Sequence, residues 1–199
     1  MFHTILSNMD NVNNIYFLMA EIHAEISTIG KDTIRLNSNT LKGQVLSLFL
    51  AYLKINDVSR NDIYYLFKKI KFIMQYDHEQ HHIDLTYKYL PLLKVNTLLK
   101  SPIFKESSNN STAFLLYPVL QAFDVFLYTE RNVPMIVFVG NDQRANINIL
   151  RDIGKKLKFK NENIIVNPHL YEHVLSDNKA TTKMSKSLNN FVRFNDING

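Results

Sequence analysis

The sequence has 199 residues, of which 46% are hydrophobic and 21% are charged, a balance typical of a globular protein with a substantial core. It contains no cysteine, which excludes disulfides, thiolate nucleophiles and cysteine-bound metals and fits a reducing compartment. The net charge of +5 is compatible with a nucleic-acid partner but does not require one. The apolar runs are too short to span a bilayer, and we expect neither a signal peptide nor a membrane partner. We therefore expect a cytoplasmic location, with an organelle as the alternative.

The first predicted element is a buried parallel strand over 15–20, a short apolar run that ends at Glu21-Ile22-His23. In open α/β sheets the ligand crevice lies just outside the carboxyl ends of the strands. His23 would therefore face such a crevice. The alternative is a histidine that only satisfies a hydrogen bond at the end of a strand.

Two helices and a second strand are predicted next. Residues 37–39 can cap a helix that begins near Thr40, and apolar residues on more than one face of 41–53 predict that this helix is well buried. A shorter helix is expected over 61–67. The apolar run 70–74 predicts the second core strand.

A histidine cluster at positions 78, 81 and 82 follows the second strand. The spacing of His78 and His82 would place both on one helix face, as metal ligands require, but no carboxylate and glycine pattern of a known zinc motif accompanies them. We favour the polar start of a helix over a metal site. Helical structure is expected to continue to about Lys100, with a break at Pro91.

A polar, turn-rich loop is predicted over 104–112, and a helix over 113–128. In this helix Tyr117, Gln121 and Asp124 follow at intervals of four and three, so they share one face. Buried polar groups need partners. Either a structural hydrogen-bond network or a polar ligand can supply those partners.

A third strand over 135–139 leads into the turn Gly140-Asn141-Asp142-Gln143 and then into a helix over 144–157. The glycine allows a ligand to approach the backbone, and Asp142 and Gln143 can bond ribose hydroxyls or an amide. A fourth strand is expected over 163–167. The pattern predicts the α/β class, with a Rossmann-type parallel sheet flanked by helices in a single domain over 1–199.

The most distinctive stretch is the string KMSKS at 183–187, which follows a polar loop over 176–182. Two lysines three residues apart, with hydroxyl side chains around them, can bind a polyphosphate as mobile point charges. A solvated charged loop is the alternative.

Five landmarks in order resemble the tryptophanyl-tRNA synthetase family of class I aminoacyl-tRNA synthetases. The helix YPVLQAFDVFLY at 117–128 resembles that family's YPVLQAADILLY, and VGNDQ at 139–143 with LRDI at 150–153 resembles its VGEDQ turn and following helix. FKE at 104–106 resembles its FKEK loop, the strand ending in His23-Ala24 resembles its first-half strand, and KMSKS is the second class I signature. The resemblance covers about 14–190. Tyrosyl-tRNA synthetases share the YxxxQxxD helix, but the FKE loop favours the tryptophanyl family.

Some features depart from the family pattern. The segment 1–12 has no glycine and no match to the first, HIGH-type signature, and Ser107 and Asn141 replace a lysine and an acidic residue. The resemblance implies a catalytic domain without the N-terminal HIGH-signature segment and the C-terminal anticodon-binding domain. We therefore expect these residues alone to form adenylate weakly or not at all, which tryptophan-dependent exchange between ATP and pyrophosphate measures. A non-catalytic paralogue that binds amino acid, nucleotide or a protein partner is an alternative to the enzyme.

The resemblance implies a tryptophan–tRNA ligase of protein biosynthesis, which activates tryptophan with ATP to tryptophanyl-adenylate and transfers it to tRNA(Trp). ATP and Mg²⁺ are the implied cofactors, and a homodimer is compatible with the family. Tyrosyl specificity on the same fold is the alternative. The family assigns catalysis to Lys183, Ser185 and Lys186. It implies tryptophan binding by His23, Tyr117, Gln121, Asp124 and Gln143. It implies ATP binding by Lys105, Gly140, Asn141, Asp142, Val174, Lys183, Met184, Ser185, Lys186 and Ser187.

Overall fold

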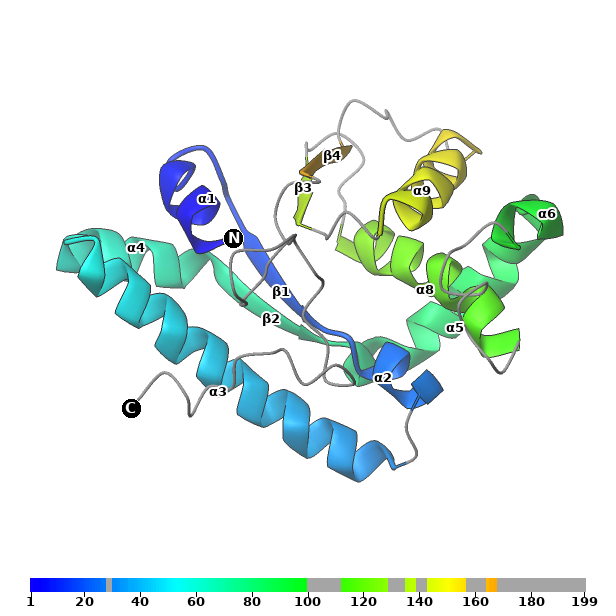
Figure 1. Ribbon diagram of the computed structural model, residues 1–199, viewed down its shortest axis with the longest axis horizontal. Helices are drawn as coiled ribbons and strands as arrows, with labels where there is room; N and C mark the ends of the chain where they lie inside the picture. Colours follow the sequence, from blue (N-terminus) through cyan, green and yellow to red (C-terminus); the bar gives the residue numbers. More distant parts are fainter. Residues whose placement is uncertain (28–29, 100–111, 129–134, 139–142, 157–163, 168–199) are drawn as a thin grey trace, which may run out of the picture. The chain divides into compact units, whose positions relative to one another are not determined.

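The computed structural model describes residues 1–27, 30–99, 112–128, 135–138, 143–156 and 164–167 (Figure 1). The chain divides into two compact units, Met1–Asp84 and Leu85–Gly199. Each unit contains one pair of parallel strands. The assignment of the whole chain to one domain stays a prediction.

The first unit is organised around strands β1 (Ile15–Met19) and β2 (Ile70–Met74), which lie side by side in Figure 1. They pair in parallel, from Ile15 opposite Ile70 to Met19 opposite Met74. Parallel strands need a long crossover connection, and three helices supply it here. The two predicted strands are confirmed, and their bounds differ from the expected ones by at most one residue.

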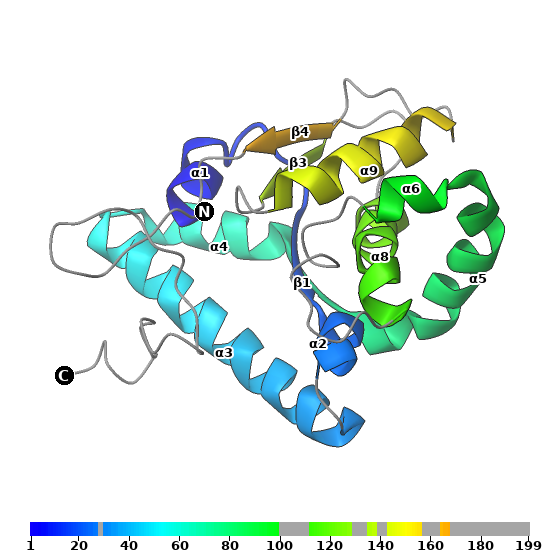
Figure 2. The same ribbon diagram turned by 45° about the vertical axis from the view of Figure 1, so that its right-hand side comes forward.

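Helix α1 precedes β1, three helices connect the strands, and a short 3₁₀ turn and a further helix follow β2. Their bounds are α1 Phe2–Ser7, α2 Glu21–Ser27, α3 Lys31–Ile55, α4 Arg60–Lys69, η1 Gln75–His78 and α5 Glu79–Tyr89. The Ser59 hydroxyl accepts a hydrogen bond from the Asp62 amide at 3.2 Å and so caps α4. The last turns of α3 lie beside α1 and α4, and its first turns lie near α2 (Figure 2).

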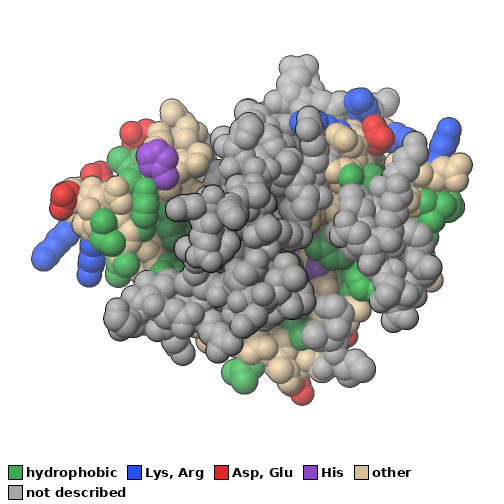
Figure 3. Space-filling model, in the orientation of Figure 1, with side chains coloured by type: hydrophobic (Ala, Val, Ile, Leu, Met, Phe, Trp, Pro, Cys, Tyr) green, Lys and Arg blue, Asp and Glu red, His purple; other side chains and the backbone are tan. Residues whose placement is uncertain are grey.

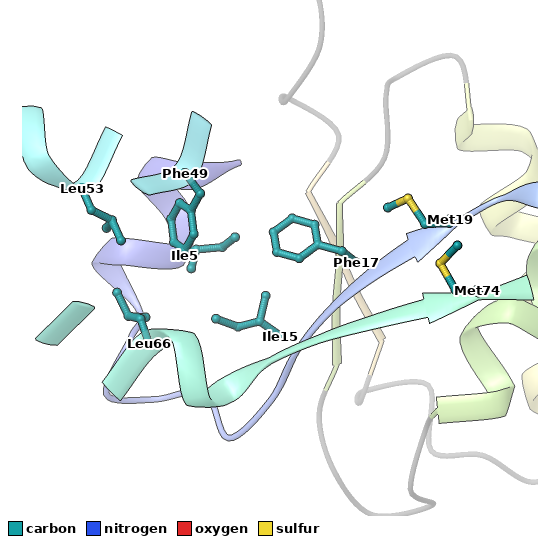
Figure 4. Close-up of a cluster of buried hydrophobic side chains, with 8 residues drawn as sticks. All are labelled: Ile5, Ile15, Phe17, Met19, Phe49, Leu53, Leu66 and Met74. Atoms are coloured by element: carbon teal, nitrogen blue, oxygen red, sulfur yellow. The ribbon is translucent and has the colours of Figure 1, made fainter. Parts of the chain in front are cut away.

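The core of the first unit forms where α1, α3 and α4 cover one face of the strand pair. Figure 4 shows side chains of all three helices directed toward β1. Phe49, Leu53 and Leu66 are fully buried, and the Phe2 ring lies 4.8 Å from that of Phe49. Burial of such side chains contributes roughly 1.5–3 kcal/mol each, which makes this cluster the main stabilisation of the unit. Its buried members are Ile5, Ile15, Phe17, Met19, Phe49, Leu53, Leu66 and Met74.

The predicted start of α3 near Thr40 is wrong, because the helix begins at Lys31. Gly30 precedes it with a φ of 117°, a left-handed conformation that glycine adopts without strain. Ile34 is buried and Arg35 is ion-paired, so contacts distant in sequence stabilise the early turns and outweigh the capping tendency of 37–39. The burial predicted for 41–53 holds for only part of this stretch, because Phe49 and Leu53 are completely buried whereas Leu41 is 48% exposed.

In the second unit the helical structure of α5 is interrupted near Pro91, as predicted. Its elements are η2 Leu90–Leu92, α6 Val95–Leu98, α8 Thr112–Tyr128, β3 Met135–Phe138, α9 Arg144–Lys156 and β4 Ile164–Asn167. Strands β3 and β4 are parallel, with Met135 opposite Ile164 and Phe138 opposite Asn167. The helices and strands predicted over 113–128, 135–139, 144–157 and 163–167 are confirmed within one residue at each end, and the helical structure expected to about Lys100 is described as far as Leu98.

Helices α8 and α9 pack against each other to form the core of the second unit. The stripe Ile149, Leu150 and Ile153 of α9 follows helical periodicity, and all three side chains are at most 4% exposed. Val119, Ala122 and Phe123 of α8 are completely buried in the same cluster. This packing fixes the positions of the polar side chains that both helices also carry.

Charged side chains of both signs are interspersed over the described part of the face shown in Figure 3, without a continuous basic patch. Within the described ranges, no helix combines the length and the apolar character needed to cross a bilayer.

Candidate functional site

The first part of the candidate site is the polar face of α8. Tyr117, Gln121 and Asp124 lie on one side of this helix, as the spacing predicts. Asp124 is only 6% exposed, whereas Tyr117 and Gln121 are half-buried. Pro118, inside the helix, is fully buried and has no N–H to donate to the carbonyl four residues earlier. The face thus combines a buried carboxylate with an amide and a phenol closer to solvent.

Asn146 connects this face to the start of α9. Its Nδ2 donates hydrogen bonds to Oε1 of Gln121 at 3.0 Å and to Oε1 of Gln143 at 2.9 Å. Asn146 is 1% exposed and precedes Ile149, Leu150 and Ile153 on the same stripe of α9. The structure therefore brings two predicted site residues together through a third that sequence analysis missed. The available signal was an asparagine at an otherwise apolar position of the stripe.

His23 lies in the first unit, in the first turn of α2, directly after the carboxyl end of β1 as predicted. The backbone amides of Ile22 and His23 donate to Gln75 Oε1 at 2.8 and 3.4 Å. Gln75 is completely buried and follows β2 immediately. Its side chain thus caps the N-terminus of α2 and ties His23 to the ends of both strands.

A buried ion pair stabilises the same end of the strand pair. Glu21 is 1% exposed, and its two carboxylate oxygens accept from Arg35 Nη1 at 3.0 and 2.8 Å. The Tyr76 amide donates to Glu21 Oε2 at 3.0 Å, and Arg35 Nη2 also binds Asp77. The hydrogen bonds from Arg35 to Glu21, and then to Asp77, raise the pKa of the Arg35 guanidinium. Burial raises the pKa of the Tyr76 phenol.

Among the described residues, no group of three His, Asp or Glu side chains is placed to hold a metal ion, and this includes the histidine cluster at 78, 81 and 82. His82 is 2% exposed in α5, whereas His78 and His81 line an open hollow of about 280 Å³ together with Asp77, Gln80 and Asp84. The polar helix start predicted for this stretch is confirmed, because η1 ends at His78 and α5 begins at Glu79.

The remaining predicted site residues lie outside the described residues, as do the predicted loops over 104–112 and 176–182 apart from Thr112. These site residues are Lys105, Gly140, Asn141, Asp142, Val174, Lys183, Met184, Ser185, Lys186 and Ser187. Of the five predicted tryptophan contacts, four belong to the second unit and His23 belongs to the first.

A model of the family described as tRNA synthetases class I (W and Y) matches residues 3–198. The chain belongs to this family. The match includes every stretch on which the resemblance rests, so the family predicted from the sequence is confirmed.

Curated relatives of the chain are tryptophan–tRNA ligases. That of Mycoplasma genitalium is 28% identical, and the match covers 92% of this chain and 51% of that protein. That of Thermotoga maritima is 31% identical over 120 residues, which cover 56% of this chain and 35% of that protein. The chain spans about half the length of the relatives that it matches over most of its own length.

Solved tryptophanyl-tRNA synthetases share the fold. The structure from Mycoplasma pneumoniae has a TM-score of 0.68 and 23% identity, and the match covers 94% of this chain and 51% of that one. The Campylobacter jejuni structure complexed with ADP and tryptophan has a TM-score of 0.63 and 22% identity, with 95% and 55% covered. The predicted α/β class with a Rossmann-type parallel sheet is confirmed.

We expect Arg35→Met to lower the free energy of unfolding by about 2–3 kcal/mol, because it leaves the buried Glu21 carboxylate without its cation. The exposure of the Arg35 side chain, 35%, places the effect below that of a fully buried pair. Denaturant titration measures the change. Lys31→Met is the matched control, since Lys31 and Glu79 pair at 2.8 Å with both side chains well exposed. Equal effects of the two substitutions would contradict the assignment.

Proposed function

We propose that this chain supplies tryptophan and ATP binding in a tryptophan–tRNA ligase, which forms tryptophanyl-adenylate and transfers the aminoacyl group to tRNA(Trp). The observation that carries the proposal is the polar face of α8, with buried Asp124 beside Gln121, joined to Gln143 through Asn146. The names of the curated relatives support it. The chain spans about half of their length.

Asp124 is the proposed acceptor for the indole N–H of tryptophan. The indole nitrogen is a donor only, and a carboxylate is an acceptor only, so the two are complementary. A ligand without this donor would forgo a hydrogen bond to a buried charge, so the proposed site disfavours such ligands. In this proposal Tyr117, Gln121, Gln143 and His23 bind the rest of the amino acid.

ATP would be bound by the residues that the family assigns to it. Lys183 and Lys186 are proposed to hold the pyrophosphate and to stabilise the charge that develops as it leaves the α-phosphorus. Gly140, Asn141 and Asp142 would face the ribose, and Mg²⁺ would arrive on the phosphates of ATP.

We expect Asp124→Ala to weaken tryptophan binding by about 2–4 kcal/mol, the range for a buried hydrogen bond to a charged group together with its packing. Isothermal titration calorimetry on the full 199-residue chain measures the affinity. Asp152→Ala is the matched control, because Asp152 is exposed on α9. Equal affinities of the unsubstituted chain and Asp124→Ala would eliminate the proposed role. Tighter binding of tyrosine than of tryptophan would favour tyrosyl specificity instead.

Replacing Lys183 and Lys186 together by alanine is expected to weaken ATP and pyrophosphate binding and to leave tryptophan affinity unchanged. The reason is that each ammonium makes charge-assisted bonds to phosphate oxygens only. A double substitution of the exposed Lys54 and Lys155 removes the same net charge and serves as the control. If the nucleotide affinity falls equally in both double variants, general electrostatics explains the effect. If it falls in neither, the KMSKS stretch of this chain does not bind phosphate.

A further inference from the structure

We propose that Asn146 is a positioning residue of the amino-acid site, which fixes the orientation of the side-chain amides of Gln121 and Gln143 before the ligand binds. The proposal rests on the proposed function, because it assumes that these two glutamines contact the bound amino acid. The side-chain amide of Asn146 donates to both glutamines, so in this proposal it acts on the ligand through them.

The hydrogen-bond geometry makes this a clamp. A primary amide nitrogen carries two hydrogens, and Nδ2 of Asn146 uses one for each glutamine, at 3.0 and 2.9 Å. The two acceptors come from different elements, because Gln121 belongs to α8 and Gln143 directly precedes α9. One buried side chain thus sets the relative orientation of two groups that the chain separates by 22 residues.

The clamp determines which atoms the glutamines present. A carboxamide is planar, so when Oε1 faces Asn146 the Nε2 group points the other way, and each oxygen keeps a second lone pair. Gln121 and Gln143 are both half-buried, which leaves part of each amide accessible to a ligand. A ligand that meets amides already held in place avoids the entropic cost of ordering them.

Packing alone does not explain an asparagine at this position. The same stripe of α9 continues with Ile149, Leu150 and Ile153, and an apolar side chain would fit its pattern. A buried amide is tolerated only with its hydrogen bonds made. Asn148, two residues further along the same helix, is exposed, so its amide can be hydrated and does not need partners inside the protein.

The experiment compares Asn146→Leu and Asn146→Asp in the full chain, by calorimetric titration with tryptophan. Leucine has a similar size without polar atoms, and aspartate keeps the shape but has no N–H to donate. We expect each substitution to weaken tryptophan binding about tenfold, the effect of losing the clamp's hydrogen bonds and the orientation they impose. Asn148→Leu and Asn148→Asp are the matched controls and should change the affinity less than about twofold.

A double-mutant cycle separates positioning from a purely structural role. If Asn146 acts through the glutamines, Asn146→Leu should weaken binding by only about threefold in a Gln143→Ala background, where half of the clamp is already lost. A purely structural role predicts that Asn146→Leu weakens tryptophan binding by the same factor with and without Gln143→Ala. It also predicts that the substitution lowers the thermal stability of the chain. Circular dichroism identifies a variant that fails to fold, and the aspartate variant then replaces the leucine variant.

The outcomes are distinguishable. Unchanged tryptophan affinity in both folded Asn146 variants would overturn the positioning role and leave the proposed function standing. Equal factors in the two backgrounds would do the same. No tryptophan binding by the unsubstituted chain, in a titration where Asp124→Ala behaves identically, would overturn the proposed function together with the inference that rests on it.

Discussion

The carboxylate of Glu21 is the group on which the organisation of the first unit depends. A charge that is 1% exposed must be compensated inside the protein, and Glu21 is compensated by a two-point contact with Arg35 and by the Tyr76 amide. These partners come from α3 and from the turn after β2, whereas Glu21 itself follows β1. One carboxylate therefore joins the ends of both strands to the long crossover helix, and Gln75 adds a second link by capping α2. Because His23 lies in the first turn of α2, the cap by Gln75 also positions His23.

In the second unit a buried neutral side chain, Asn146, likewise joins separate segments through hydrogen bonds. Apolar packing of α8 against α9 brings Gln121 and Gln143 within reach of one another, and the buried amide of Asn146 then satisfies both. In each unit a buried polar side chain binds atoms from two separate segments, Glu21 in the first unit and Asn146 in the second. Such side chains specify relative positions that non-directional apolar contacts leave free.

Sequence analysis predicted those features of the fold that depend on local sequence patterns. Short apolar runs gave β1, β2, β3 and β4 nearly to the residue, because a buried parallel strand is a continuous apolar stretch between polar ends. The spacing of Tyr117, Gln121 and Asp124 also gave their common face, since helical periodicity is a local property. The start of α3 was missed because the early turns are stabilised by Glu21 and Asp77, which lie 14 and 42 residues from Arg35. Asn146 was missed for the same reason, as its partner in α8 is 25 residues away.

Asp124 alone would not distinguish tryptophan from tyrosine. An indole N–H and a phenol O–H are both hydrogen-bond donors, so a buried carboxylate accepts from either. Under the proposed function, discrimination between the two ligands would then come from the distance between that carboxylate and the groups that hold the α-amino and α-carboxyl ends. In this chain Gln121 is three residues from Asp124 on the same helix, and Gln143 is tied to it through Asn146. Under the proposed function, the clamp would make the Asp124 contact a measure of ligand length, because a fixed spacing penalises any side chain whose donor lies at the wrong distance.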